Sequence, residues 1–555
     1  MTSAPADDQD TVLRTDVLVL GGGPAGTSAA LAAAAAGAGV VLADKGWCGT
    51  SGAAASSGVG VWYVEPDAVA REEAKASREG LGGFLADHDW MDGVLDETYS
   101  RVGWLAERGY PFPVKEGGRQ ARGSLQGPEL MRRLRREVVR ARAKILDHSP
   151  VLELLQDDDG MVTGATGVHR QTGRSWTVHA GAVVVATGGC AFLSGGLGCD
   201  VLTGDGHLAA AEVGAELSGM EFSNAYAIAP AHSSVTKTAF YGRASFRYAD
   251  GTIIEGAGSA RGRSVIARTL LEQPVYAVLD GWAPEHHAWL RRSQPNFFLA
   301  FDRAGIDPFV DAFEVTMRLE GTVRGTGGLR IVDAECATTV PGLYAAGDAA
   351  TRELICGGFT GGGSHNSAWA LSSGTWAGRG AARHAVADPA TGRTGRPAGT
   401  VGLGPVASAG TGGPTAREVV QAVQDQVQPY DINLFRTGDG LAHARGVLDG
   451  LWSEVRGGLA PADGARGAVR IREAAAMVAH ARWMYEAAAR RTETRGMHKR
   501  QDFPEQDPAQ RHRLVVGGLD TPWVRVSPLA GESPAAPRPE SALGAAGGGT
   551  AAVAA

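Results

Sequence analysis

Cysteine is scarce in this chain, with five residues among 555, and no two of them form a Cys-x-x-Cys pair. An odd and scattered set argues against a disulfide framework, a structural zinc site and an iron–sulfur cluster. We therefore expect no metal site here. Any iron–sulfur cluster that serves this chain should lie on another protein.

Long runs of one charge and long apolar runs are also missing. The 60 acidic and 53 basic residues give a net charge of −7 without a block of either sign, so neither nucleic acid nor a membrane surface is an expected partner. The N-terminal MTSAPADDQD does not resemble a signal peptide, and no uncharged apolar run is long enough to span a bilayer. These absences favour a cytoplasmic protein with a small-molecule or protein partner. The length of 555 residues is enough for about two to four domains.

Glycine, by contrast, is abundant, and its first cluster carries a recognisable pattern. A strand-like run, TDVLVL at residues 15–20, leads into GGGPAG and then into an alanine-rich helical segment. Gly21, Gly23 and Gly26 fit Gly-x-Gly-x-x-Gly, in which bare backbone approaches a pyrophosphate. The next strand, VVLADK, ends in Asp44, where a carboxylate can accept hydrogen bonds from a ribose 2′-hydroxyl. The pattern predicts a dinucleotide-binding unit.

Two later strand-like segments, AVVVATGG at 182–189 and LYAAGD at 343–348, indicate which dinucleotide binds. With the first unit, they resemble the flavoproteins that have two dinucleotide-binding domains. The resemblance implies FAD, with Thr187 and Gly188 near the cofactor and Asp348 at its ribityl or pyrophosphate portion. Asp348 has a second interpretation as the N-cap of a helix, and the two roles are compatible.

The stretches GTSGAAASSGVGVWY at 49–63 and TETRGMHKRQDFPEQD at 492–507 narrow the resemblance. They are similar to the flavoprotein subunit family of succinate dehydrogenase, fumarate reductase, L-aspartate oxidase and adenylylsulfate reductase, over about residues 15–510. The family implies further FAD-binding residues at Lys45, Ser51, Gly52 and Ala53. Membrane-bound relatives carry a flavin-linking histidine here. This chain has none between Lys45 and Tyr63, which implies noncovalent FAD.

The same resemblance implies an α/β architecture: a Rossmann-like FAD fold of the two-dinucleotide-binding-domain type, an inserted α+β capping domain and a helical C-terminal domain. The expected boundaries are an FAD-binding domain at 12–222 and 323–390, a capping domain at 223–322, a linker at 391–415, a helical domain at 416–528 and a disordered tail at 529–555.

The glycine-rich stretch GGFTGGGSHNS precedes another helical segment. In the family, the corresponding helix directs its N-terminus at the isoalloxazine ring, where its partial positive charge stabilises the reduced flavin. Ser364 or Asn366 would cap this helix, and His365 would lie beside the flavin or over the substrate as a catalytic residue. The alternative for His365 is a hydrogen bond to a loop carbonyl.

A candidate proton donor lies in ARGRSVIARTLL at 260–271, which resembles the family's capping-domain segment with a catalytic arginine. Arg263 occupies that arginine's position. The acid that usually follows is Ser264 here, and the family's Arg-Gly-Glu-Gly-Gly relay is not recognisable. An arginine is a poor acid unless its surroundings favour proton release. A helix-surface role for Arg263 therefore stays open.

The residues with which the family holds two carboxylates are missing. The three regions concerned read FTGGGSHNS, MEFSNAYA and GTVRGTGGL, which argues against a C4 dicarboxylate substrate. We predict an FAD-dependent oxidoreductase for a small, anionic organic substrate. The alternatives are an adenylylsulfate-reductase-like subunit with an iron–sulfur partner, and an electron-transfer flavoprotein without its own substrate. A ferredoxin-type or other electron-transfer protein is a candidate partner.

Overall fold

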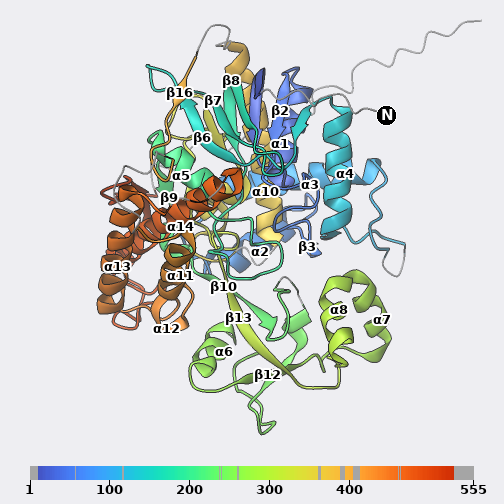
Figure 1. The fold of residues 1–555 in the computed structure, drawn as a ribbon. Helices are drawn as coiled ribbons and strands as arrows, with labels where there is room; N and C mark the ends of the chain where they lie inside the picture. The colour runs from blue at the N-terminus through green and yellow to red at the C-terminus, as the bar shows by residue number, and fades with distance from the viewer. Residues whose placement is uncertain are drawn as a thin grey trace, which may run out of the picture.

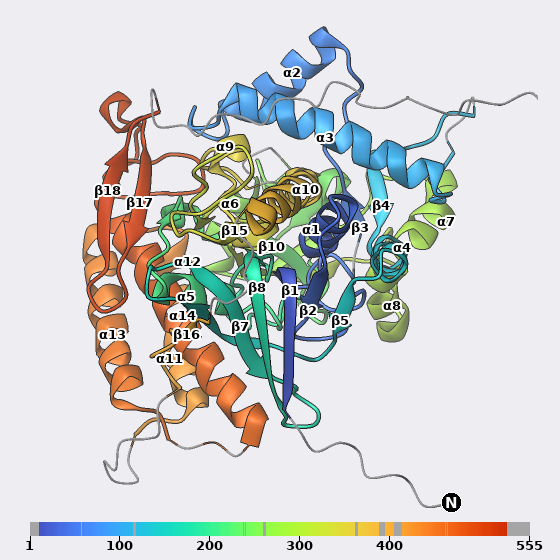
Figure 2. The same cartoon turned by 90° about the horizontal axis from the view of Figure 1, so that it is seen from above.

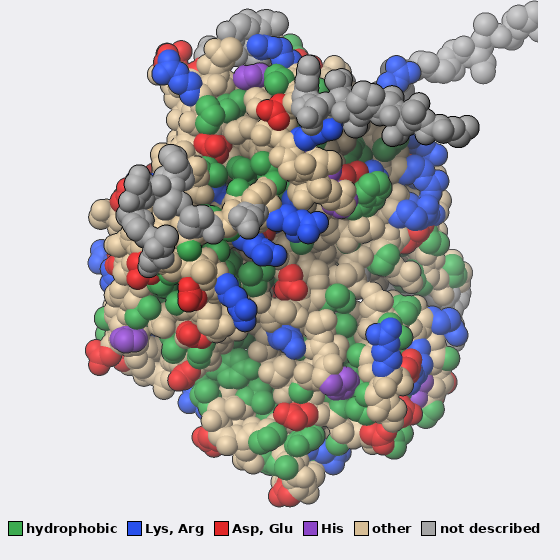
Figure 3. Space-filling view, in the orientation of Figure 1, with side chains coloured by type: hydrophobic (Ala, Val, Ile, Leu, Met, Phe, Trp, Pro, Cys, Tyr) green, Lys and Arg blue, Asp and Glu red, His purple; other side chains and the backbone are tan. Residues whose placement is uncertain are grey.

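The computed structural model describes residues 10–529 with ten internal gaps, which are 57, 115–117, 237, 239, 259–261, 361–363, 388–393, 404–412, 461 and 463. The expected disordered tail falls almost wholly outside the described residues, and so does the glycine triplet 361–363. In the described ranges, no helix is both long and apolar enough to cross a bilayer. Acidic and basic side chains are interspersed on the face that Figure 3 shows.

An eight-stranded sheet forms the centre of the upper body in Figure 1. Its parallel part joins strands that are far apart in sequence, because β8 pairs with both β1 and β15. The ATG and LYAAGD segments therefore leave the sheet beside the first glycine cluster. In spatial order the strands are β16 (Arg396–Pro397), β6 (Val151–Gln156), β7 (Val162–Val168), β8 (Ser175–Val185), β1 (Thr11–Leu20), β2 (Val40–Ala43) and β5 (Lys144–Leu146), with β15 (Leu343–Ala345) on β8.

Small residues let helices pack closely on this sheet. A Cβ on Gly374 or Gly378 of α10 (Ser364–Ala387) would lie 2.3 or 2.2 Å from backbone oxygens of α1 (Pro24–Ala35). Figure 2 shows α1 and α10 between the sheet and α3. The other helices around the sheet are α2 (Ala68–Glu79), α3 (His88–Glu107), α4 (Gly127–Arg140), α5 (Asp205–Glu212) and α9 (Glu353–Cys356). A small two-stranded antiparallel sheet pairs β3 (Gly58–Gly60) with β4 (Ser124–Gln126).

The segment between β10 and β13 forms the lower lobe of Figure 1. Its antiparallel sheet alternates buried and more exposed residues along β13, and a cluster of phenylalanines fills the space beneath its helices. The elements are β10 (Ala225–Pro230), η2 (Phe240–Arg243), β11 (Ser245–Arg247), α6 (Gly262–Leu270), β12 (Val275–Val278), α7 (Pro284–Ser293), α8 (Pro295–Ala304) and β13 (Phe313–Gly321).

The C-terminal region packs helices against the main body on the left of Figure 1. Its helices are α11 (Ala416–Val427), α12 (Tyr430–Asn433), α13 (Gly438–Gly457) and α14 (Gly464–Arg490). The chain then returns as strands, in a sheet ordered β14 (Gly328–Leu329), β9 (Leu217–Ser218), β17 (Arg513–Gly517) and β18 (Trp523–Ser527). Short 3-10 helices are η1 (Met220–Phe222), η3 (Gly347–Ala349) and η4 (Pro508–Gln510).

Part of the expected linker is ordered against the main sheet. Residues 396–397 form β16, which pairs antiparallel with β6, and Gly399 N donates to Glu153 Oε2 at 3.0 Å. The local glycine and proline content predicted a linker without regular structure. In the structure, the free edge of the sheet supplies hydrogen-bond partners for this part of the backbone. The domain boundaries themselves stay a prediction.

A buried ion network joins the C-terminal region to the rest of the protein. Arg491 contacts Glu221 Oε1 at 2.8 Å and Glu493 Oε1 at 2.8 Å, and all three side chains are fully buried. Arg495 continues the network through Glu493 Oε1 at 2.6 Å. Because Glu221 precedes the cavity residue Asn224 by three positions, this network also supports the wall of the site described below.

Glu353 lies beside this network and gives a pH-dependent prediction. Burial raises the pKa of this carboxyl to about 7, although Arg513 opposes the rise. An unfolded glutamate titrates near a pKa of about 4.3, so the folded state holds the extra proton between about pH 4.3 and 7. The stabilising contribution is therefore complete below the unfolded pKa and is lost as pH rises through 7.

We expect Glu353→Gln to be more stable relative to the parent protein at pH 8 than at pH 5, by up to about 3 kcal/mol. Urea unfolding of both proteins at the two pH values measures this difference. The buried histidines, whose pKa values are lowered by burial, contribute a slope of opposite sign that is common to both proteins. An equal difference at pH 5 and pH 8 would contradict the prediction.

Candidate functional site

A cavity lies at the carboxyl ends of β1, β2 and β8, where the parallel sheet meets the N-terminus of α1. The predicted cofactor-binding residues that line it are Gly21, Gly23, Asp44, Lys45, Ser51, Gly52, Ala53, Thr187, Gly188, Asp348 and Asn366. Sequence segments separated by hundreds of residues thus meet at one place. We call this space the cofactor cavity.

The glycines of the first cluster have different local roles. A Cβ on Gly21, whose φ is +107°, would lie 2.2 Å from Ala186 O of the neighbouring strand segment. A Cβ on Gly26 would lie 1.8 Å from Gly21 O, so this glycine permits the helix to pack on the turn and does not line the cavity. A Cβ on Gly23 would meet no protein atom within 4 Å. Gly23 therefore leaves space at the helix N-terminus, where an anion is favoured.

Asp44 is held rigidly where β2 ends. Its carboxylate accepts hydrogen bonds from Gly22 N at 2.6 Å, Gly46 N at 2.8 Å and Ser51 Oγ at 2.7 Å. Since a carboxylate offers about four acceptor positions, Asp44 retains capacity for a ligand hydroxyl. Ser51 thus orients Asp44 in addition to lining the cavity.

The side chains of Lys45 and Asp348 are both engaged with protein groups. The Lys45 ammonium contacts Asp205 at 2.6 Å and Glu473 at 2.7 Å, and it donates to Thr203 Oγ1 at 2.8 Å. Asp348 forms an ion pair with the fully buried Arg352. These contacts orient the two residues at the cavity wall.

A second cavity, of about 1860 Å³, lies between the main body and the lower lobe. It is lined by Arg263, Ser364, Thr360 and Asn224, among others. The two cavities share Gly58, Val59 and Arg324, so they meet beside β3. We call this space the large cavity. A substrate in the large cavity would therefore lie next to a ligand in the cofactor cavity.

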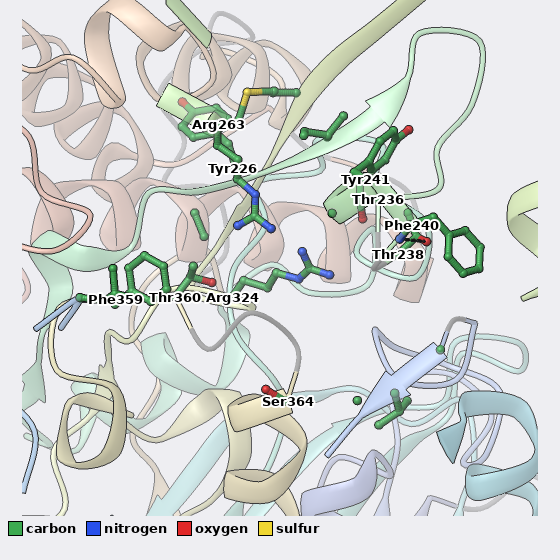
Figure 4. Close-up of a pocket in the computed structure, with 18 of the residues that line it drawn as sticks. Tyr226, Thr236, Thr238, Phe240, Tyr241, Arg263, Arg324, Phe359, Thr360 and Ser364 are labelled. Carbon is green, nitrogen blue, oxygen red and sulfur yellow. Dashed lines mark hydrogen bonds between the residues drawn. The ribbon is translucent and has the colours of Figure 1, made fainter. Parts of the chain in front are cut away.

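Two arginines from different elements face one another across the large cavity (Figure 4). Arg324, in the turn after β13, contacts Glu320 Oε2 through Nε at 2.8 Å, and Thr236 Oγ1 donates to Glu320 Oε1 at 2.6 Å. The Arg263 side chain, in α6, is exposed to the cavity and forms no side-chain hydrogen bond or ion pair with any residue that the structure describes. Protein atoms around the cavity, followed by repulsion from Arg324, lower the pKa of Arg263, whereas Glu320 and the exposure of the side chain to the cavity oppose this shift.

His365 lies between Ser364, which lines the large cavity, and Asn366, which lines the cofactor cavity. Its ring packs on Trp62 with centroids 4.3 Å apart, its side chain is buried, and neither cavity has it among the described lining residues. The catalytic role of His365 stays a prediction. Residue 364 is already the first residue of α10, and the Asn366 amide donates to Val323 O at 2.8 Å. The position before α10, where a cap would act, is outside the described residues.

The sequence analysis missed Arg324 and Glu320. The stretch GTVRGTGGL is one of the three regions without the family's dicarboxylate-binding residues, although it contains an arginine within a glycine-rich turn. That arginine was the available signal, because a cation among glycines near an expected ligand site can contact an anion. Glu320 had no local signal, since only the fold brings β13 next to α6 and Thr236.

Comparisons with known proteins match this arrangement. Residues 16–232 match a family model described as an FAD binding domain, and residues 421–528 match one described as the fumarate reductase flavoprotein C-terminal region. The L-aspartate oxidase of Streptomyces coelicolor is 29% identical over 566 aligned positions, which cover 92% of each chain.

Solved structures show the same fold over nearly the whole chain. The Sdh1 complex of Mycobacterium smegmatis has a chain with a TM-score of 0.75 at 22% identity, covering 94% of this chain and 96% of that one. Adenylylsulfate reductase from Archaeoglobus fulgidus has a TM-score of 0.74 at 18% identity, covering 95% and 99%.

The cofactor cavity fits FAD, which these comparisons support as the cofactor. The open space at Gly23 faces the position for a pyrophosphate, and Asp44 can bind a ribose hydroxyl. Two buried polar atoms in the cavity wall, Thr187 Oγ1 and Asn366 Oδ1, have no protein partner in the described part of the chain. A polar cofactor would satisfy such atoms.

Proposed function

Because the chain belongs to the FAD-dependent flavoprotein family of succinate dehydrogenase and fumarate reductase, we propose that it transfers hydride between noncovalently bound FAD and an anionic organic substrate other than a C4 dicarboxylate. FAD, when bound, supplies the hydride chemistry. The chain supplies a binding site for the substrate's anionic group between its two lobes.

The pair Arg263 and Arg324 is the observation that carries this proposal. Both guanidinium groups line the large cavity, and Arg324 also lines the cofactor cavity. Arg263 has donors to spare for a carboxylate, whereas Glu320 holds Arg324 in place. An anion bound between them would keep the rest of the substrate at the junction of the two cavities, where hydride transfer requires it.

The surroundings of this arginine pair support one anionic group more than two. Two of the three regions that would complete a dicarboxylate site contribute only neutral residues to the large cavity, among them Asn224, Thr360 and Ser364, whereas the third contributes Arg324. A second carboxylate there would lose its hydration without gaining charge-assisted hydrogen bonds. This argues against succinate, fumarate and aspartate.

Arg263 is also our candidate for proton transfer to or from the substrate. Its lowered pKa makes proton release easier than from an ordinary arginine. Glu320 has an ion pair with Arg324 and stabilises positive charge near Arg263, so Glu320 acts as a positioning residue in this proposal.

The first test is the visible spectrum of the purified protein before and after acid precipitation. Flavin should appear in the supernatant, because noncovalent binding does not survive unfolding; flavin in the pellet would contradict that part of the proposal. Titration of the holoprotein with fumarate and succinate should leave turnover at background. Bleaching by sulfite would instead favour the adenylylsulfate-reductase-like alternative.

Arg263→Gln should raise the Kd of a simple carboxylate, such as benzoate, by about tenfold to a hundredfold, because a charge-assisted hydrogen bond is lost. The perturbation of the flavin absorbance measures this binding. FAD content should stay at the parent level. Arg303→Gln, at an exposed position of α8 that does not line the cavity, is the matched control. Equal benzoate affinity in Arg263→Gln and the parent protein would overturn the role of Arg263.

A further inference from the structure

The large cavity is too spacious for a compact anion alone. Its volume of about 1860 Å³ exceeds the roughly 300–1,000 Å³ of pockets that enclose drug-sized ligands. The two arginines account for one part of it only. The residues of the remaining wall therefore indicate the chemistry of the rest of the substrate.

Four aromatic side chains contribute to that remaining wall on the lower lobe. We call Phe240, Tyr241, Trp282 and Trp289 the aromatic wall; all four line the large cavity. Figure 4 shows Phe240 and Tyr241 away from Arg263, on the far side of the Arg324 guanidinium. The wall continues outward, since the Trp282 ring lies 6.2 Å from the Phe240 ring and Trp282 Nε1 donates to Phe240 O at 3.1 Å.

The outer end of the wall exposes ring surface that packing within the lobe does not require. In α7, His287 stacks on Phe309 with centroids 3.6 Å apart and so belongs to the core of the lobe. Trp289, two residues later, lines the cavity with 49% of its surface exposed. No ring contact between Trp289 and another described residue accompanies this exposure. A large exposed indole in a cavity wall is typical of a surface that packs against a ligand.

The two arginines and the aromatic wall thus lie in different parts of the large cavity. We propose that the substrate combines a single carboxylate or comparable anionic group, bound by Arg263 and Arg324, with a planar aromatic ring system that packs on the aromatic wall. This inference rests on the proposed function, because it names the substrate class of the same site. Offset or edge-to-face contacts with such rings favour an aromatic body over an aliphatic one of similar size.

The test uses the holoprotein and a graded set of probes: acetate, benzoate, 2-naphthoate and the neutral 2-naphthalenemethanol. Binding is followed by the flavin absorbance. We expect 2-naphthoate to bind at least tenfold more tightly than acetate and at least tenfold more tightly than the neutral alcohol. Equal affinity for acetate and 2-naphthoate would overturn the aromatic part of the inference. Equal affinity for 2-naphthoate and the alcohol would overturn the anionic part.

Variants separate this inference from the proposed function. Trp282→Leu and Trp289→Leu should each weaken 2-naphthoate binding at least threefold and leave acetate binding unchanged. Trp523→Leu, which alters a partly exposed tryptophan of β18 outside the cavity, is the matched control. If carboxylates bind through Arg263 but neither tryptophan variant affects 2-naphthoate, the inference is wrong and the proposed function stands. If no carboxylate perturbs the flavin, both are overturned.

Discussion

Replacing Arg491 with methionine is expected to lower the free energy of unfolding by about 3–5 kcal/mol. The substitution leaves the fully buried Glu221 without the guanidinium that contacts it at 2.8 Å. It also removes donors from Gln510 O and His512 O, at 3.0 and 2.9 Å. A buried carboxylate without its partner cannot recover its hydration, which makes the loss much larger than the net value of the pair. The midpoint of urea unfolding measures the effect.

A matched surface substitution provides the control. Arg456 contacts Asp520 Oδ1 at 2.9 Å, but both side chains are well exposed, at 37% and 60%. Arg456→Met should therefore cost less than about 1 kcal/mol. The double substitution Arg491→Met with Glu221→Gln should recover part of the stability, because it removes the unpaired charge. Similar losses for Arg491→Met and Arg456→Met would contradict the structural role assigned to the buried network.

Gly26→Ala is expected to yield protein that retains little or no FAD. The new Cβ would lie 1.8 Å from Gly21 O and 2.9 Å from Gly21 C. No rotamer change can relieve a clash between a Cβ and backbone, so the turn must move away from the helix N-terminus. That movement displaces the amides that face the pyrophosphate position. The ratio of flavin to protein absorbance after purification measures the loss.

Two other glycines show whether the effect is specific. Gly103→Ala in α3 places its Cβ in open space, so FAD content and stability should match or slightly exceed those of the parent. Gly23→Ala meets no protein atom either, but it fills space in the cofactor cavity. It should keep the parent's thermal stability without ligand and bind FAD more weakly. Full flavin content in Gly26→Ala would rule out this account of the turn.

The cofactor site was largely predictable because its signals are local. Glycines at fixed spacing, a strand before them and Asp44 after the next strand all fall within about thirty residues. The predicted strands at 15–20, 182–189 and 343–348 are confirmed in β1, β8 and β15. The roles of the individual residues stay predictions, although the structure brings eleven of them to one cavity.

The substrate site was much less predictable. His365 stood out in its glycine-rich stretch, yet it packs on Trp62 and lines neither cavity. Arg324 and Glu320 were not predicted, although they form an ion pair with one another and both affect the pKa of Arg263. The expected linker has a strand that completes the edge of the main sheet. Each of these outcomes depends on a contact between segments that local sequence does not connect.

The sequence by itself determined the cofactor, the class of protein and the absence of the usual dicarboxylate-binding residues. The dinucleotide-binding unit follows from the spacing of glycines along the chain, whereas FAD, the protein class and the missing dicarboxylate-binding residues follow from the resemblance of short motifs to a known family. Tertiary structure alone decided that Arg263 and Arg324 face one cavity, and that an aromatic wall shares it. Side chains from α6, η2, α7 and the turn after β13 meet there because the lower lobe folds these segments around one space, whose opposite wall the main body supplies. The positions of these residues along the chain do not predict that they lie close together.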